Sequence, residues 1–204
     1  QIRPWEVLDQ QVLDLLFVVK REDFVPPPYR DLAFADMEIP IGSGQVMLAP
    51  RIEARLLQEL GIQKTDKVLE IGTCSGYMAA LLAARAEHVV SIESRPALAD
   101  IARQNLERAG VGNVTVEVGN GANGWAQRGP YDVIVVSGSL PTLPDALLRQ
   151  LRVGGRLAAI VGAAPVMEAQ LVTCSSEGVF NTINLFETVA PPLDGGEAKP
   201  GFAF

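Results

Sequence analysis

The sequence is poor in several residue types, and each shortage excludes a class of protein. Two cysteines among 204 residues, Cys74 and Cys174, are too few for a disulfide framework, so we expect a reducing, cytoplasmic compartment. The chain has a single histidine, His88, and no Asp, Glu and His cluster with ligand spacing, so we expect no metal. No apolar run approaches the ~20 residues of a membrane-spanning helix, and we expect no membrane partner.

Basic residues are also few. The chain carries 17 Lys and Arg against 24 Asp and Glu, a net charge of −7. An acidic surface repels phosphate backbones, so we expect no nucleic-acid partner. The length and the 48% of hydrophobic residues fit one globular domain with a full core.

The sequence pattern changes near Gly61. Before it, apolar spacing predicts helices over roughly 6–20 and over 51–60, separated by an irregular stretch over 31–50 with one short apolar run. After it, strands and helices alternate. The predicted strands cover 67–71, 88–93, 113–118, 131–137 and 155–161; the helices cover 75–85, 96–109 and 144–151; a final hairpin covers 166–174 and 179–189.

This alternation predicts a Rossmann-like α/β fold. The sheet is expected to be mostly parallel, with helices on both faces and an antiparallel edge hairpin at the C-terminal end. In such sheets a ligand binds at the carboxyl ends of the strands, where the strand order reverses.

The most informative stretch is 68–77, Val-Leu-Glu-Ile-Gly-Thr-Cys-Ser-Gly-Tyr. Gly72 permits a sharp turn with room for a ligand, Gly76 is expected to let the helix pack close to the strand, and the first helical N–H groups favour an anion. The same helix end predicts a lowered pKa for Cys74. A dinucleotide motif would need two further glycines where Cys74 and Tyr77 stand, which disfavours NAD. An ordinary strand-to-helix turn remains the alternative.

The next predicted strand ends in a carboxylate, Glu93. It follows the glycine loop by about 20 residues, the place of the acidic residue that binds a ribose diol. A carboxylate accepts hydrogen bonds from both hydroxyls at once. A solvated charge at a strand end is the alternative interpretation of Glu93 alone.

Several segments together resemble the protein-L-isoaspartate O-methyltransferase family, from about residue 23 to 193. They are 39–45 (Ile-Pro-Ile-Gly-Ser-Gly-Gln), 68–77, 89–93, 154–157 (Gly-Gly-Arg-Leu) and 189–193 (Val-Ala-Pro-Pro-Leu), the last resembling the closing strand of the family. The resemblance implies the Rossmann-like class I methyltransferase fold, S-adenosylmethionine as cofactor, and a cytoplasmic repair enzyme. Such enzymes methylate the abnormal α-carboxylate of isoaspartyl residues in damaged proteins and peptides, leading to succinimide formation.

The resemblance also implies a division of the single domain 1–204 and a set of site residues. Residues 1–60 would form an N-terminal helix and substrate-side loop region, 61–193 the S-adenosylmethionine-binding core, and 194–204 a tail. On the substrate side the implied site residues are Val46, Leu48 and Arg51. The implied cofactor-binding residues are Glu70, Gly72, Thr73, Cys74, Ser75, Gly76, Glu93, Asn120, Gly121 and Ser137.

The sequence departs from the family pattern in the substrate loop. The family has Gly-x-Thr-Ile-Ser-x-Pro where this chain has 44–50, so Val46 and Leu48 replace two hydroxyl residues. Burying a carboxylate against Leu48 without another donor would cost several kcal/mol. Asn120 replaces the usual Asp of a Gly-Asp-Gly turn, and 137–140 replaces an Ala-rich run.

Three interpretations therefore stay open. The chain repairs isoaspartate with Arg51, Ser43 or backbone N–H groups as donors, or it methylates a different carboxylate or hydroxyl on an unidentified small molecule. The third is an S-adenosylmethionine-binding protein without isoaspartyl activity. For a carboxylate substrate no general base is needed, because the nucleophile is already ionised at neutral pH.

Overall fold

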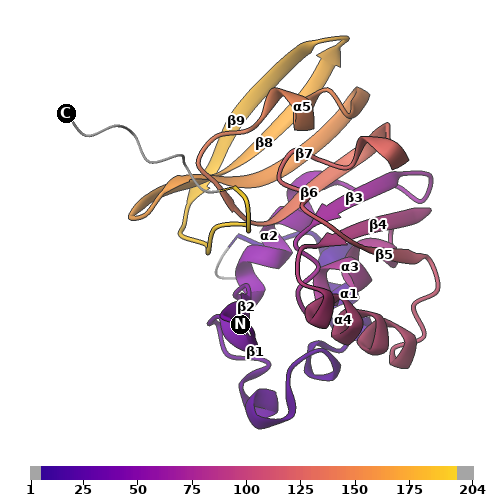
Figure 1. Cartoon of the computed structure of the whole chain (residues 1–204), viewed down its shortest axis with the longest axis vertical. Helices are drawn as coiled ribbons and strands as arrows, with labels where there is room; N and C mark the ends of the chain where they lie inside the picture. The colour runs from indigo at the N-terminus through magenta and orange to yellow at the C-terminus, as the bar shows by residue number, and fades with distance from the viewer. Residues whose placement is uncertain (1–5, 197–204) are drawn as a thin grey trace.

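A twisted sheet runs through the computed structural model, which describes residues 6–196 (Figure 1). Within these residues the sheet has seven strands in the order β5-β4-β3-β6-β7-β8-β9. Their bounds are β3 (Lys67–Ile71), β4 (His88–Glu93), β5 (Val114–Val118), β6 (Tyr131–Leu140), β7 (Leu151–Ala163), β8 (Val166–Ser176) and β9 (Val179–Glu187).

The strand directions confirm the predicted fold class. The five strands from β5 to β7 are parallel, and β8 and β9 add antiparallel pairs at one edge. The chain builds β3, β4 and β5 outward in one direction and then returns to place β6 on the other side of β3. The strand order therefore reverses between β3 and β6, and a ligand site is expected at their carboxyl ends.

Alternate residues of each central strand enter two separate apolar layers. In β3, Val68 packs in one cluster and Leu69 in the other, both fully buried. The first cluster contains residues of α1 (Gln10–Val18), α2 (Pro50–Leu60), α3 (Tyr77–Ala83) and α4 (Pro96–Arg108), and the second contains Leu147 of the short α5 (Asp145–Leu148). Both faces are covered, but most of the helical mass lies on one of them.

Local signals explain where the N-terminal helices begin and end. The prediction of 51–60 with Gly61 beyond it holds closely for α2, because Gly61 adopts φ +51°, a left-handed conformation that glycine tolerates. The predicted helix over 6–20 is too long. The Asp9 side chain accepts a hydrogen bond from Gln11 N–H and starts α1 at Gln10, and the backbone turns extended at Val19.

The stretch predicted as irregular, 31–50, contains a small antiparallel hairpin, and two 3₁₀ helices lie between α1 and this hairpin. The 3₁₀ helices cover Arg21–Asp23 and Pro27–Leu32, and the hairpin pairs β1 (Ile39–Gly42) with β2 (Gln45–Met47). Strands of four and three residues show too little alternation to be recognised in a sequence.

The later elements are shifted rather than misassigned. Strand β7 begins before the predicted 155, while α5 is a single turn of the predicted helix 144–151. A further 3₁₀ turn covers Ala126–Arg128.

The segment 189–193 is not the closing strand that its resemblance implied. Its pairing with the sheet is a single parallel bridge between Ser139 and Pro192, because two consecutive prolines lack the N–H groups that a ladder needs. Asp194, assigned to the tail in the predicted division, forms an ion pair with Arg95. Residues 197–204 lie outside the described residues, and the division itself stays a prediction.

No helix in the described part of the chain is both long and apolar enough to cross a membrane.

Candidate active site

A pocket opens where the carboxyl ends of β3, β4 and β6 meet, at the point of strand reversal. We call it the cofactor pocket. In Figure 1 the β1–β2 hairpin and the yellow C-terminal segment approach the carboxyl ends of the strands from the same end of the sheet. The lining residues are Gln45, Val46, Leu48, Ile71, Gly72, Cys74, Ile92, Glu93, Ser94, Gly119, Gly121, Ala122, Ser137, Gly138, Pro191, Pro192, Leu193 and Asp194.

Gly72 forms the floor of this pocket in a conformation that only glycine adopts readily. Its φ is +94°, and a Cβ there would lie 3.1 Å from the Ser137 carbonyl oxygen and 3.2 Å from a Leu193 methyl group. The sharp turn predicted at Gly72 agrees with this φ, whereas the side that a Cβ would take is filled by Ser137 and Leu193, so the predicted room for a ligand stays a prediction.

One prediction about the following turn is wrong. The side of Gly76 where a Cβ would lie faces α4, 3.3 Å from both the Ala102 carbonyl oxygen and Leu106, so Gly76 allows two helices rather than a helix and a strand to approach. The helix begins at Tyr77, whose N–H lies 3.4 Å from Ser75 Oγ, and the predicted role of the first helical N–H groups toward an anion stays a prediction.

Glu93 joins the end of β4 to the glycine loop. Its side chain is 4% exposed, and one carboxylate oxygen accepts from Cys74 N–H at 2.9 Å while the other accepts from Arg95 N–H at 3.1 Å. These bonds fix the carboxylate at the pocket wall and exclude the alternative of a solvated charge. Its lone pairs leave acceptor capacity for a ligand.

Glu70 lies fully buried behind the same loop. Ser91 Oγ donates to one of its oxygens at 2.5 Å and Ser137 Oγ to the other at 3.1 Å. Burial raises the pKa of Glu70 to about 8, although the two serine hydrogen bonds act in the opposite direction. Glu70 therefore lies behind the glycine loop and lines the inner cavity described next.

Several predicted cofactor residues line a smaller inner cavity beside the cofactor pocket rather than the pocket itself. Thr73 and Ser75 belong there with Glu70, and Thr73 Oγ1 lies 2.6 Å from Ser91 Oγ. Val46, Leu48, Gly72, Cys74 and Ser137 line both spaces.

The turn after β5 contributes backbone rather than its asparagine side chain. Gly121 lines the pocket with its Cα close to Ile71 and Ile92, where a Cβ would lie 2.8 Å from Ile71. Asn120 is not a lining residue. Its side-chain oxygen accepts from Ala122 N–H, and its amide lies against Gly195.

Cys74 is not the activated thiol that the sequence predicted. Burial raises its pKa, and the nearby carboxylates of Glu93 and Glu70 raise it further. The expected helix N-terminus does not act on it, because α3 starts three residues later. Cys74 instead adopts φ +52° and offers its backbone N–H to Glu93.

The substrate loop, 44–50, meets the glycine loop that follows β3, called the cofactor loop below, from the opposite side of the pocket. Val46 and Leu48 line the cofactor pocket, as predicted, whereas Arg51 does not. The Arg51 guanidinium lies 3.3 Å from the Asp36 carboxylate, and Ser43 lies exposed in the turn between β1 and β2. Neither residue is thus placed to replace the two missing hydroxyls.

Comparisons with known proteins give a consistent result. The model of the protein-L-isoaspartate(D-aspartate) O-methyltransferase (PCMT) family matches residues 3–196. A protein-L-isoaspartate O-methyltransferase of Methanoculleus marisnigri is 42% identical over 98% of this chain and 93% of its own, and one of Koribacter versatilis is 40% identical over 97% and 88%.

The chain belongs to this family.

Solved structures agree on the fold. A putative protein-L-isoaspartate O-methyltransferase from Plasmodium falciparum, in complex with S-adenosyl-L-homocysteine, superimposes with a TM-score of 0.81 at 19% identity, covering 94% of both chains. A second structure, titled protein-L-isoaspartate O-methyltransferase, gives 0.79 at 25% identity and covers 94% of this chain and 63% of its own. This isoaspartate methyltransferase family member thus has the class I methyltransferase fold.

Sequence reasoning missed Gln45, which lines the cofactor pocket immediately before Val46. The sequence holds no signal for it, because strand alternation places Gln45 on the face opposite Val46 and Leu48, and only the tertiary arrangement brings it to the pocket. The Gln45 amide carries two N–H donors.

Sequence reasoning also missed the C-terminal segment 191–194 as a wall of the pocket. Ser139 N–H donates to the Pro191 carbonyl at 2.8 Å, and Leu193 N–H donates back to the Ser139 carbonyl at 3.0 Å. Asp194 accepts from Arg95 Nε and from Ser94 Oγ, both at 2.7 Å, and these bonds lower the pKa of Asp194. Residues 100 positions apart in sequence meet here, which no local pattern predicts.

Proposed function

We propose that this chain transfers a methyl group from S-adenosylmethionine to the α-carboxylate of isoaspartyl residues in proteins and peptides. The observation that carries the proposal is the single pocket in which the Gly72 floor and buried Glu93 face the substrate loop residues Gln45, Val46 and Leu48. In this pocket the residues proposed to bind the cofactor face the residues proposed to bind the substrate, and no helix or strand lies between them.

The residues present fit the cofactor. Gly72 and Glu93 border the same pocket, and Glu93 offers carboxylate oxygens to a ribose diol. Of the proposed cofactor residues, Gly72, Cys74, Glu93, Gly121 and Ser137 would border it directly. Glu70, Thr73, Ser75, Gly76 and Asn120 would hold those residues in place.

When bound, S-adenosylmethionine would supply a methyl group attached to a positively charged sulfur. Transfer of this methyl group to a substrate carboxylate oxygen would break the carbon–sulfur bond and release a neutral thioether. The chain needs no general base for such a nucleophile. Its contribution is alignment and exclusion of water, which are provided by the apolar side chains of Val46, Leu48 and Leu193 around the pocket.

On the substrate side, Gln45 takes the place of the missing hydroxyls. Its amide N–H groups would hold the substrate carboxylate, while Val46 and Leu48 keep the surroundings dry. A hydrogen bond to a charged group is worth about 1.5–3 kcal/mol, which offsets part of the cost of bringing the carboxylate out of water.

A methyl-transfer assay tests this function. We expect the protein to methylate a peptide with one isoaspartyl residue and to leave the same peptide with an ordinary aspartyl residue unmodified. Binding of S-adenosylhomocysteine by calorimetry, without methylation of the isoaspartyl peptide, would contradict the proposal and favour another substrate or a binding role.

A further inference from the structure

A buried cation lies beneath the substrate loop. Arg21, in the 3₁₀ helix Arg21–Asp23, is only 3% exposed. One terminal nitrogen pairs with the buried Glu53 carboxylate of α2, and the other donates to the Leu48 carbonyl oxygen at 2.7 Å. One side chain thus connects the loop to the helix that follows it.

The same guanidinium also reaches the element behind the cofactor loop. Its central carbon lies 5.0 Å from the centre of the Tyr77 ring, within the range of a cation–π contact. Tyr77 is the first residue of α3, directly after the glycine loop. Its ring packs on the ring of Phe24, with 5.6 Å between the two ring centroids. Arg21 therefore touches the substrate loop and the cofactor loop's helix at once.

Stability alone does not explain a buried pair of this kind. Burying two charges costs desolvation energy that their attraction barely offsets, and replacing such a pair by apolar residues of similar size is often neutral or stabilising. Arginine suits a different task, because its planar group presents several donors in fixed directions, whereas a lysine ammonium is a single point charge.

We propose that Arg21 is a positioning residue for methyl transfer: it holds the Leu48 carbonyl so that Val46 and Leu48 stay in register with the cofactor loop. Glu53 orients the guanidinium for this contact. The expected effect of Arg21 on catalysis rests on the proposed function. Its expected effect on the order of the loop 45–48 does not depend on that function.

The test replaces the pair by apolar residues. In the double variant Arg21→Met, Glu53→Leu, we expect a fold as stable as the wild type and an affinity for S-adenosylhomocysteine within about twofold. Loss of alignment should lower kcat on the isoaspartyl peptide by about 10- to 100-fold, with a smaller change in KM. Amide hydrogen exchange over 45–48 should become faster.

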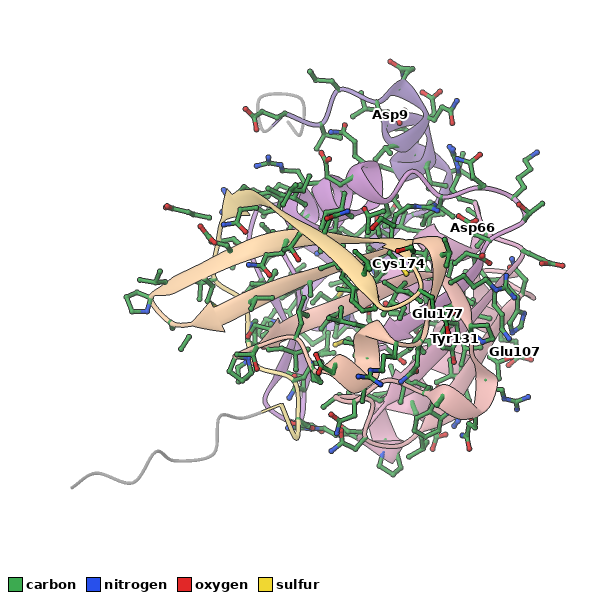
Figure 2. The ribbon with its side chains drawn as sticks, turned by 90° about the horizontal axis from the view of Figure 1, so that it is seen from above. Asp9, Asp66, Glu107, Tyr131, Cys174 and Glu177 are labelled. Carbon is green, nitrogen blue, oxygen red and sulfur yellow. The ribbon has the colours of Figure 1, made fainter. Side chains whose placement is uncertain are left out.

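A matched control exists at the other end of the sheet. Arg156 also bonds one carboxylate, Asp66 at 2.7 Å, together with the backbone carbonyls of Leu60 at 2.7 Å and Gly61 at 3.2 Å. Figure 2 labels Asp66 and Tyr131, which lie where β3 and β6 begin, away from the pocket. The double variant Arg156→Met, Asp66→Leu should leave kcat and exchange over 45–48 unchanged.

The outcomes are distinct. A stable Arg21→Met, Glu53→Leu variant with wild-type kcat and slow exchange over 45–48 overturns the inference and leaves Arg21 a structural residue. If that variant fails to fold, Arg21→Lys decides: it keeps a charge opposite Glu53 but lacks the planar group that holds Glu53 and the Leu48 carbonyl in two fixed directions, so retained kcat overturns the inference. Wild-type protein that is inactive on isoaspartyl peptide, with exchange responding as expected, defeats the proposed function and not the positioning role.

Discussion

The two sides of the pocket are built on different principles. The cofactor side is local and rigid: Gly72 and Cys74 belong to one turn, Glu93 ends the neighbouring strand, and a backbone N–H ties them together. The substrate side is long-range: Leu48 is held by Arg21, 27 residues away in sequence, and the opposite wall comes from the C-terminal segment.

This difference teaches where variation is tolerated. A strand-turn-helix unit fixes a cofactor through backbone geometry, so few substitutions preserve it. A loop supported by side chains from elsewhere depends on those contacts, as the hydrogen bond from Arg21 to the Leu48 carbonyl shows. Breaking each side in turn should therefore affect different measurements.

The largest effect is expected on the cofactor side from Gly72→Val. A branched side chain would be strained at φ +94° and would meet the Ser137 carbonyl and Leu193. We expect S-adenosylhomocysteine binding to fall by about 100-fold or more in calorimetry, because each 1.4 kcal/mol is a factor of ten. Gly110→Val, at φ +71° with open space around it, is the control for backbone strain alone. Equal losses in the two variants would contradict the assigned floor.

A smaller effect on the same side is expected from Glu93→Ala. The substitution removes the charged acceptor at the pocket wall and releases Cys74 N–H, so affinity for S-adenosylhomocysteine should fall about 10- to 100-fold. Glu93→Gln keeps an acceptor for the loop amide, and it separates the loss of charge from the loss of loop anchoring. Unchanged affinity in both variants would remove Glu93 from the site.

Predictability from sequence follows the same division. The strand ends, the turn at Gly72 and the carboxylate Glu93 were predicted because all three depend on patterns within about 20 residues. Tertiary contacts decide the positions of Gln45, Arg21 and the segment 191–194, so local sequence patterns do not predict them. Arg51, the predicted substrate-loop donor, lies in the first turn of α2 and pairs with Asp36 instead.

The pKa of Cys74 shows the same limit. The sequence places a thiol near a helix start, but the position of that start and the surrounding carboxylates decide the sign of the shift. Both are consequences of packing between β3, β4 and α4, which the local pattern does not contain.

A modest effect on stability is expected from replacing Glu70, the buried carboxyl group behind the glycine loop. Glu70 has an ordinary pKa of 4.5 when unfolded and about 8 when folded, so the folded state keeps a proton that the unfolded state loses. Stability from this group is therefore greatest below about pH 4.5 and declines as the pH rises toward 8. Glu70→Gln should flatten that decline in urea unfolding between pH 5 and 8. A decline as steep as in the wild type would show that Glu70 is ionised in the folded protein.

The most direct test of the central claim, one pocket with separable cofactor and substrate sides, is a paired measurement on Gln45→Ala. Gln45 lines the pocket from the substrate loop and belongs to neither the glycine turn nor β4. We predict that kcat/KM for the isoaspartyl peptide falls by about tenfold or more, the equivalent of one hydrogen bond to a charged group, while S-adenosylhomocysteine affinity stays within about twofold. Unchanged kcat/KM, or a parallel loss of cofactor affinity, would contradict the account.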